Sequence, residues 1–62
     1  MLYEKIRDYI VKEDLKYSSV AVRAGIQMNA FSAMMDGKRK ITAEEYFAIC
    51  KALSVPLDQF AE

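Results

Sequence analysis

Three consecutive cationic side chains, Lys38, Arg39 and Lys40, follow directly after Gly37. Lysine and arginine side chains can neutralise phosphate groups and release the counterions condensed on them, which makes binding to a polyanion depend on salt. Charge runs in turns are also commonly just solvated, so the run alone leaves both interpretations open. The polar side chains that precede the cations favour the phosphate interpretation.

Those preceding side chains are the carboxamides of Gln27 and Asn29 and the hydroxyl of Ser32. A carboxamide can bond N6 and N7 of adenine at the same time, and a hydroxyl can bond bases or phosphates. The alternative is that the two amides only start a helix, since asparagine is a good cap, and that Ser32 is solvated. Met28 would pack on a thymine methyl group, or it would be an exposed or dimer-contact methionine.

The remaining reactive side chains do not form a catalytic or metal-binding set. The sequence contains no histidine, the usual general base and the commonest metal ligand. Its single cysteine, Cys50, lies in an apolar pattern where a thiol is normally inert. The carboxylates Glu44 and Glu45 belong to a helix start, and no glycine-rich phosphate loop is present. We therefore expect a protein that is not an enzyme and that uses no cofactor and no metal.

Charge is unevenly distributed along a chain whose formal net charge is zero. Residues 15–40 contain five cationic side chains and one acidic side chain, whereas the rest of the chain contains four cationic and eight acidic ones. A basic middle between acidic ends suits a protein that binds a polyanion through one face. The neutral total counts against nucleic acid, because DNA-binding domains are often basic.

Two short segments with apolar residues at helical spacing would position the polar side chains. The first follows Ser18 and Ser19, either of which is a good N-cap, because a hydroxyl accepts a bond from a free N–H of the first turn. Gly25 can adopt the left-handed conformation that closes this helix. The second helix begins at residues 27–29 and ends at Asp36–Gly37. Its outer side carries Gln27, Met28, Asn29, Ser32 and Ala33.

Three further helices are predicted around this pair, which makes a compact all-α bundle of five helices without strands. Residues 2–13 form an amphipathic helix by their apolar spacing. Thr42 and Glu45 form a capping box that opens a helix over 43–53. Pro56 suits the first turn of a last short helix over 57–60.

The apolar and aromatic residues divide into a predicted core and residues with open roles. The predicted core contains Phe31, Met34, Met35, Phe47 and Ile49. Val55, Leu57 and Phe60 either cover the open end of this core or form a dimer patch. The rings of Tyr3, Tyr9 and Tyr46 should be half-buried with their hydroxyls in water. Arg23 either contacts phosphate or pairs with a carboxylate, and we favour the carboxylate.

Length and composition predict one small cytoplasmic domain over residues 1–62. Folding of such a short chain buries only about 60% of the unfolded surface, so stability is marginal and dimerisation would help. The hydrophobic content of 53% is too high for a disordered chain. No apolar run approaches the roughly 20 residues of a membrane span, and charges at Glu4, Lys5 and Arg7 interrupt any signal peptide. A single cysteine cannot form an internal disulfide.

Several motifs occur together at a characteristic spacing. Val20-Ala21 followed by Gly25 resembles the "Leu-Ala, three residues, Gly" signature of the phage-repressor type of helix-turn-helix protein, the Cro-like or XRE family. Asp36-Gly37-Lys38-Arg39 resembles the turn after that family's third helix, and residues 50–60 (CKALSVPLDQF) resemble its closing segment. The resemblance covers nearly the whole chain.

This resemblance implies a lambda-repressor-like domain of five helices that binds double-stranded operator DNA, usually as a dimer. The family's third helix contacts base edges, and its second helix lies against the DNA backbone. Carried over to this sequence, the base-contacting residues are Gln27, Met28, Asn29, Ser32 and Ala33. The backbone-contacting residues are Ser18, Ser19, Lys38, Arg39 and Lys40. We therefore expect a small phage or prophage repressor-like transcriptional regulator that forms a weak homodimer.

The chain departs from the family pattern in three respects. Met35 stands where the family has a glutamate paired with an arginine of the first helix, and the first helix offers Ile10 here, so apolar packing replaces an ion pair. Ser54 replaces the glycine that ends the fourth helix. The expected base-contacting positions contain no arginine or lysine. The missing arginine or lysine, the apolar face of the third helix and the neutral net charge favour the alternative, a protein-interaction module on a helix-turn-helix fold that has lost most DNA reading.

Overall fold

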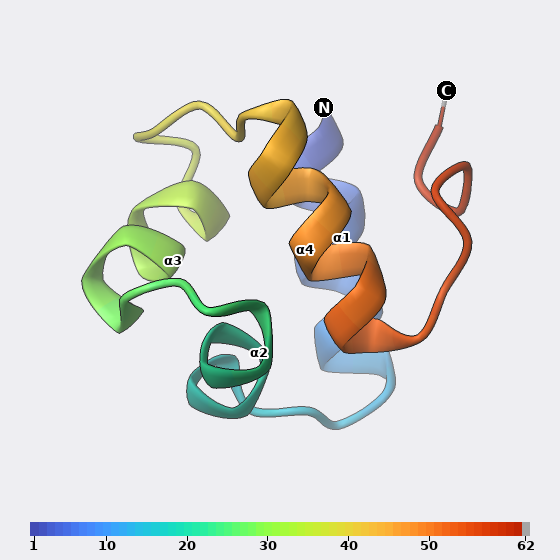
Figure 1. Ribbon diagram of the computed structural model, residues 1–62, viewed down its shortest axis with the longest axis horizontal. Helices are drawn as coiled ribbons and strands as arrows, with labels where there is room; N and C mark the ends of the chain where they lie inside the picture. Colours follow the sequence, from blue (N-terminus) through green and yellow to red (C-terminus); the bar gives the residue numbers. More distant parts are fainter. Residues whose placement is uncertain (62) are drawn as a thin grey trace.

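The computed structural model describes residues 1–61. This part of the chain is entirely helical, without strands, which confirms the predicted all-α class. Its helices are α1 (Leu2–Lys12), α2 (Tyr17–Ala24), α3 (Met28–Met35) and α4 (Ala43–Leu53) (Figure 1). None of these helices is long and apolar enough to cross a membrane.

The predicted fifth helix over residues 57–60 is wrong, because these residues form turns in the structure. The backbone N–H of Gln59 donates to the Pro56 carbonyl at 3.0 Å, and that of Ala61 donates to the Asp58 carbonyl at 3.2 Å. Both bonds join residues three apart. A segment this short cannot recover the cost of starting an α-helix through its own hydrogen bonds. Its position depends on side-chain contacts instead.

Helix α2 begins earlier than predicted. Its N-cap is Lys16, which has extended backbone angles and no side-chain capping bond. Ser18 and Ser19 therefore lie inside the helix, and the prediction that one of them caps it is wrong. Tyr17 explains the early start, since its ring packs edge-on against Phe31 with 5.6 Å between the centroids. This tertiary contact outweighs the local preference of serine for the cap position.

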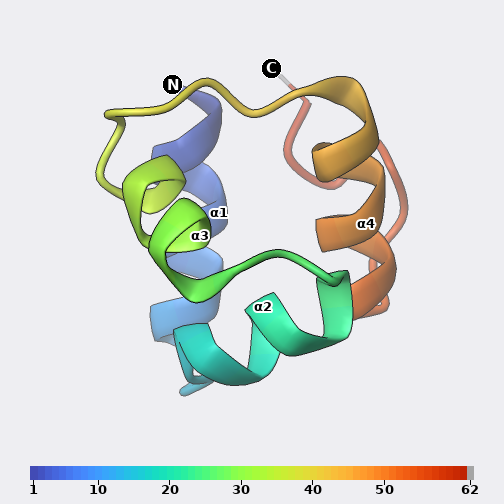
Figure 2. The same cartoon turned by 60° about the vertical axis from the view of Figure 1, so that its left-hand side comes forward.

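The turn between α2 and α3 follows the sequence prediction. Gly25 adopts the left-handed conformation at φ 71°, and the N–H of Ile26 donates to the Ala21 carbonyl at 2.9 Å. Gln27 is the N-cap of α3. The connection is short enough for the two helices to remain in contact (Figure 2).

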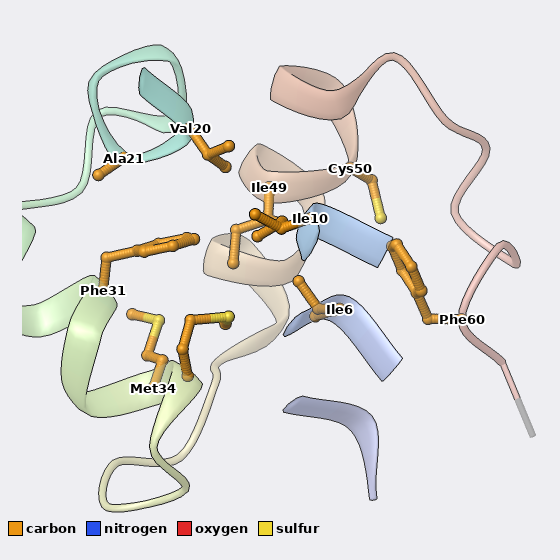
Figure 3. Packing of buried hydrophobic residues seen from close by; sticks show 10 residues of the cluster. Ile6, Ile10, Val20, Ala21, Phe31, Met34, Ile49, Cys50 and Phe60 are labelled. Atoms are coloured by element: carbon orange, nitrogen blue, oxygen red, sulfur yellow. The ribbon is translucent and has the colours of Figure 1, made fainter. Parts of the chain in front are cut away.

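The core lies between all four helices and the C-terminal segment (Figure 3). Phe31, Met34 and Met35 fill it from α3, and each is completely buried. Met35 and Ile10 belong to the same buried cluster, which agrees with apolar packing in place of an ion pair. The other buried residues are Ile6, Val20, Ala21, Ile49, Cys50 and Phe60.

Phe47 does not belong to this core, and its prediction as a core residue is wrong. Its side chain is 54% exposed, whereas Ile49 on the same helix is completely buried. Successive residues of an α-helix are rotated by about 100° around its axis. Phe47 and Ile49 are two residues apart, so their side chains point to nearly opposite sides of α4. The apolar residues of α4 therefore occupy more than one face, and the core accepts only one of these faces.

The C-terminal segment covers the open end of the core with one aromatic ring. Phe60 is 4% exposed and packs edge-on against Tyr9 and Tyr46, with centroid distances of 5.6 and 6.5 Å. Leu57 remains 53% exposed. The hydroxyl of Tyr46 donates a hydrogen bond to the Leu57 carbonyl, a partner that the sequence does not indicate.

Candidate nucleic-acid interface

The start of α3 presents polar side chains to solvent. Gln27, Met28 and Asn29 are exposed, while Ser32 and Ala33 are half-buried. The opposite face of the same helix is completely buried through Phe31, Met34 and Met35. The structure therefore brings the first three predicted base-contacting residues together and leaves the other two less accessible.

Neither carboxamide at the start of α3 is used to cap the helix. Gln27 occupies the N-cap position but makes no side-chain capping bond, and Asn29 lies one residue inside the helix start. Neither side chain has a hydrogen-bond partner among residues 1–61. Both amides are therefore available to an external partner, and the alternative that Asn29 caps the helix is ruled out.

The basic loop, defined as residues 36–41, connects α3 to α4. Gly37 adopts φ 76°, and the N–H of Lys38 donates to the Ala33 carbonyl at 2.9 Å. Lys38, Arg39 and Lys40 are all exposed. Within the described part of the chain, Lys38 and Lys40 form no ion pair.

Arg39 differs from the two lysines because it already has an anionic partner. Its Nη2 atom lies 2.9 Å from Oε2 of Glu45, whose side chain is only 18% exposed. The other carboxylate oxygen of Glu45 accepts a hydrogen bond from the Thr42 N–H at 3.0 Å. The Thr42 hydroxyl in turn accepts from the Glu45 N–H at 3.2 Å, which confirms the predicted capping box. The spacing of Thr42 and Glu45 in the sequence does not indicate that this capping box also binds Arg39.

The first turn of α2 supplies the third part of the candidate interface. Ser18 and Ser19 are exposed there. Figure 2 shows α3 with the start of α2 at one end and the basic loop at the other. The structure thus places all the segments predicted to contact DNA along one side of the molecule.

Among residues 1–61, Arg23 does not have the carboxylate partner that we favoured from the sequence. It is exposed and forms no ion pair with any carboxylate of residues 1–61. It borders a shallow groove between α2 and α4, together with Phe47 and Lys51.

Tyr3 and Glu45 contact the basic loop, and neither residue is assigned to this loop by the sequence. Tyr3 and the basic loop line a groove at the start of α1. Glu45 holds Arg39, as described above. Gly37 is the sequence signal for the Tyr3 contact, since a glycine often marks a place of close approach.

The carboxylates and the single thiol of residues 1–61 do not gather in one place. No group of three or more Cys, Asp or Glu side chains lies close enough together there to hold a metal ion. Cys50 is a buried free thiol inside the core.

No protein-family model, curated protein or solved structure matches this chain.

Proposed function

We propose that this chain is a helix-turn-helix protein that binds double-stranded DNA and regulates transcription. The observation that carries the proposal is the exposed start of α3, with two carboxamides that have no partner among residues 1–61. A basic loop and the exposed hydroxyls of α2 lie at its two ends. A recognition helix between two phosphate-binding segments is the arrangement by which such proteins contact DNA.

In this proposal α3 enters the major groove with its N-terminal end foremost. An α-helix with its side chains is about 10–12 Å in diameter, so it fits a major groove that is about 12 Å wide. Gln27 and Asn29 contact base edges, and Met28 packs on a thymine methyl group. The lysines of the basic loop and the hydroxyls of Ser18 and Ser19 contact the DNA backbone.

Direct reading of bases is limited on this surface, because no arginine or lysine lies at the start of α3. Phosphate contacts and the shape of the DNA therefore carry much of the affinity. A weak homodimer would double these contacts and place two recognition helices about 34 Å apart, one helical turn of DNA. The bound dimer would act in the cytoplasm by blocking a promoter. This activity requires no catalysis, cofactor or metal.

A protein-interaction module is the second candidate, and one observation favours it. Phe47 is 54% exposed in the groove between α2 and α4, and the cations Arg23 and Lys51 border the same groove. Exposed aromatic and arginine side chains are typical of protein interfaces. This groove involves residues other than those of the candidate DNA interface, so the two functions can be tested separately.

A fluorescence-anisotropy titration of a mixed-sequence DNA duplex, at low and at physiological salt, tests the DNA proposal. Binding should weaken steeply as salt rises, because each neutralised phosphate contributes about 0.9 to the slope of log K against log salt. The variant Lys38→Ala/Arg39→Ala/Lys40→Ala should bind all sequences more weakly and show a smaller slope. Selection from a random pool would then identify the operator.

The variant Lys51→Ala provides the matched control, since it removes a positive charge from the groove beside Phe47. It should retain the affinity and the salt slope of the wild type. Absence of any binding at low salt would reject the DNA proposal. Loss of binding in Lys51→Ala, together with normal binding in the triple variant, would instead place the polyanion on the groove of the second candidate.

A further inference from the structure

The basic loop is covered on one side by the ring of Tyr3 from α1. A Cβ atom added to Gly37 would lie 2.6 Å from Cζ and 2.8 Å from Oη of this ring. Real Cβ atoms do not approach other atoms so closely, so the ring occupies space that only glycine leaves open. The Arg7 guanidinium carbon lies 5.8 Å from the centroid of the same ring, within the range of a cation–π contact.

The loop is attached to α4 by a second contact. Glu45 uses one carboxylate oxygen for the Thr42 N–H and the other for Arg39. A charge-assisted bond between guanidinium and carboxylate is among the stronger hydrogen bonds in proteins. Because Glu45 is also fixed by its own capping bond, it holds Arg39 from a rigid position at the start of a helix.

The three cations of the basic loop therefore differ in whether their positive charge is available to bind a phosphate. Lys38 and Lys40 are exposed and form no ion pair within residues 1–61. Arg39 is bound to a carboxylate that cancels its charge locally. Transfer of Arg39 to a phosphate would leave the Glu45 carboxylate without its partner, next to the anionic DNA.

We propose that Tyr3 and Glu45 are positioning residues that hold the basic loop, that Arg39 is its internal anchor, and that Lys38 and Lys40 are the two cations of this loop that bind phosphate. The assignment of phosphate to the lysines rests on the proposed DNA-binding function. The positioning roles of Tyr3 and Glu45 do not rest on that function, because they concern the structure of the DNA-free protein. A loop held in its binding shape loses less conformational entropy when the ligand arrives.

The salt dependence of DNA binding separates the three cations. Lys38→Ala and Lys40→Ala should each reduce the slope of log K against log salt by about 0.9, the value for one phosphate contact. Arg39→Ala should leave the slope unchanged, since its charge is not used on DNA. A reduction in Arg39→Ala equal to that in Lys38→Ala would overturn the anchor role.

The variant Glu45→Gln tests the ion pair between Arg39 and Glu45 by changing its acidic partner. Glutamine can fill the same position in a capping box, so the helix start is retained while the ionic bond to Arg39 is lost. The released Arg39 becomes available to phosphate, and the slope should increase by about 0.9. The neighbouring Glu44→Gln removes an equal charge without touching Arg39 and should show no such increase. Equal slopes in the two variants would overturn the proposal.

Amide hydrogen exchange of the DNA-free protein tests whether Tyr3 and Glu45 hold the loop. The probe is the Lys38 N–H, which is bonded to the Ala33 carbonyl. Tyr3→Leu and Glu45→Gln should increase its exchange rate several-fold, whereas Tyr3→Phe, which keeps the ring, should not. The Ile26 N–H, bonded in the turn after α2, reports in the same spectra whether the rest of the fold is intact.

The two proposals fail in different ways. If the wild type does not bind DNA at low salt, the proposed function fails, and the exchange rate of Lys38 still shows whether the loop is held. If the wild type binds DNA but Tyr3→Leu exchanges like the wild type, the positioning role fails and the proposed function remains.

Discussion

Two glycines in this chain have the same backbone conformation in different surroundings. Gly25 has φ 71° with no atom within 4 Å of an added Cβ, and Gly37 has φ 76° beneath the ring of Tyr3. At Gly25 a side chain would meet only the strain of a positive φ. At Gly37 it would also displace the ring.

Alanine substitution should distinguish these two sites. We expect Gly25→Ala to lower the free energy of unfolding by about 1 kcal/mol, the usual cost of a positive φ for a residue with a side chain. Gly37→Ala should cost more, because the Tyr3 ring must move away from its packed position. Urea denaturation measures both values. In a Tyr3→Ala background the two losses should become equal, and an excess loss that persisted would contradict the steric explanation.

Asn29 provides a second prediction at the scale of the residue. It is exposed and makes no hydrogen bond within residues 1–61, so Asn29→Ala should change the free energy of unfolding by less than about 0.5 kcal/mol. Its effect should appear in discrimination between DNA sequences, where a bidentate amide contributes about 1–3 kcal/mol. Competition binding with duplexes that differ at single base pairs measures this. An unchanged preference would remove Asn29 from the base-contacting residues.

At the scale of the element, the C-terminal segment is stabilised by its tertiary contacts. Phe60 is buried between Tyr9 and Tyr46, and the Leu57 carbonyl accepts the Tyr46 hydroxyl. The turns of this segment contain only short-range backbone bonds. Within residues 55–61, Phe60 is the one buried residue, so it contributes most of the packing that holds the segment on the core.

Phe60→Ala should lower the free energy of unfolding by about 3 kcal/mol or more, the usual loss for a buried phenylalanine. Leu57→Ala is the control from the same segment. Its side chain is 53% exposed, and the carbonyl that binds Tyr46 is retained, so a change within about 0.5 kcal/mol is expected. Urea denaturation of the two variants measures the difference. Similar losses would contradict the assignment of Phe60 as the residue that closes the core.

At the scale of the whole molecule, stability should depend on pH through Tyr46. Burial raises the pKa of the Tyr46 hydroxyl, and the nearby Cys50 adds to the increase. The unfolded chain, with an ordinary pKa of about 10, therefore ionises before the folded protein does. The contribution of the neutral Tyr46 hydroxyl to the free energy of unfolding is complete below the pKa of the unfolded chain. It is lost as pH rises through the higher pKa of the folded state.

The variant Tyr46→Phe isolates this contribution from that of the lysines, which titrate in the same range. It should be less stable than the wild type by about 1 kcal/mol at neutral pH, because the bond to the Leu57 carbonyl is lost. The difference should shrink as pH rises above about 10. Urea denaturation at a series of pH values gives both curves. A constant difference would contradict the link between ionisation and stability.

The features that the sequence determined by itself are those that depend on neighbouring residues. The capping box of Thr42 and Glu45 joins residues three apart, and Gly25 closes α2 through its own backbone freedom. The burial of Phe31, Met34 and Met35 on one face of α3 follows from helical spacing. These local signals were sufficient for the all-α class and for the exposed start of α3.

The remaining features were decided only by the tertiary structure. Helix α2 starts at Tyr17, whose ring packs on Phe31. Helix α4 packs on the core with another face than the one that carries Phe47, so Phe47 is exposed. Arg39 forms an ion pair with Glu45 on the other side of a loop, and Gly37 lies against Tyr3, a residue distant from it in the sequence. Each outcome depends on a partner beyond the reach of a helical turn. Local propensities differ by about 1 kcal/mol or less, so one such contact is enough to override them.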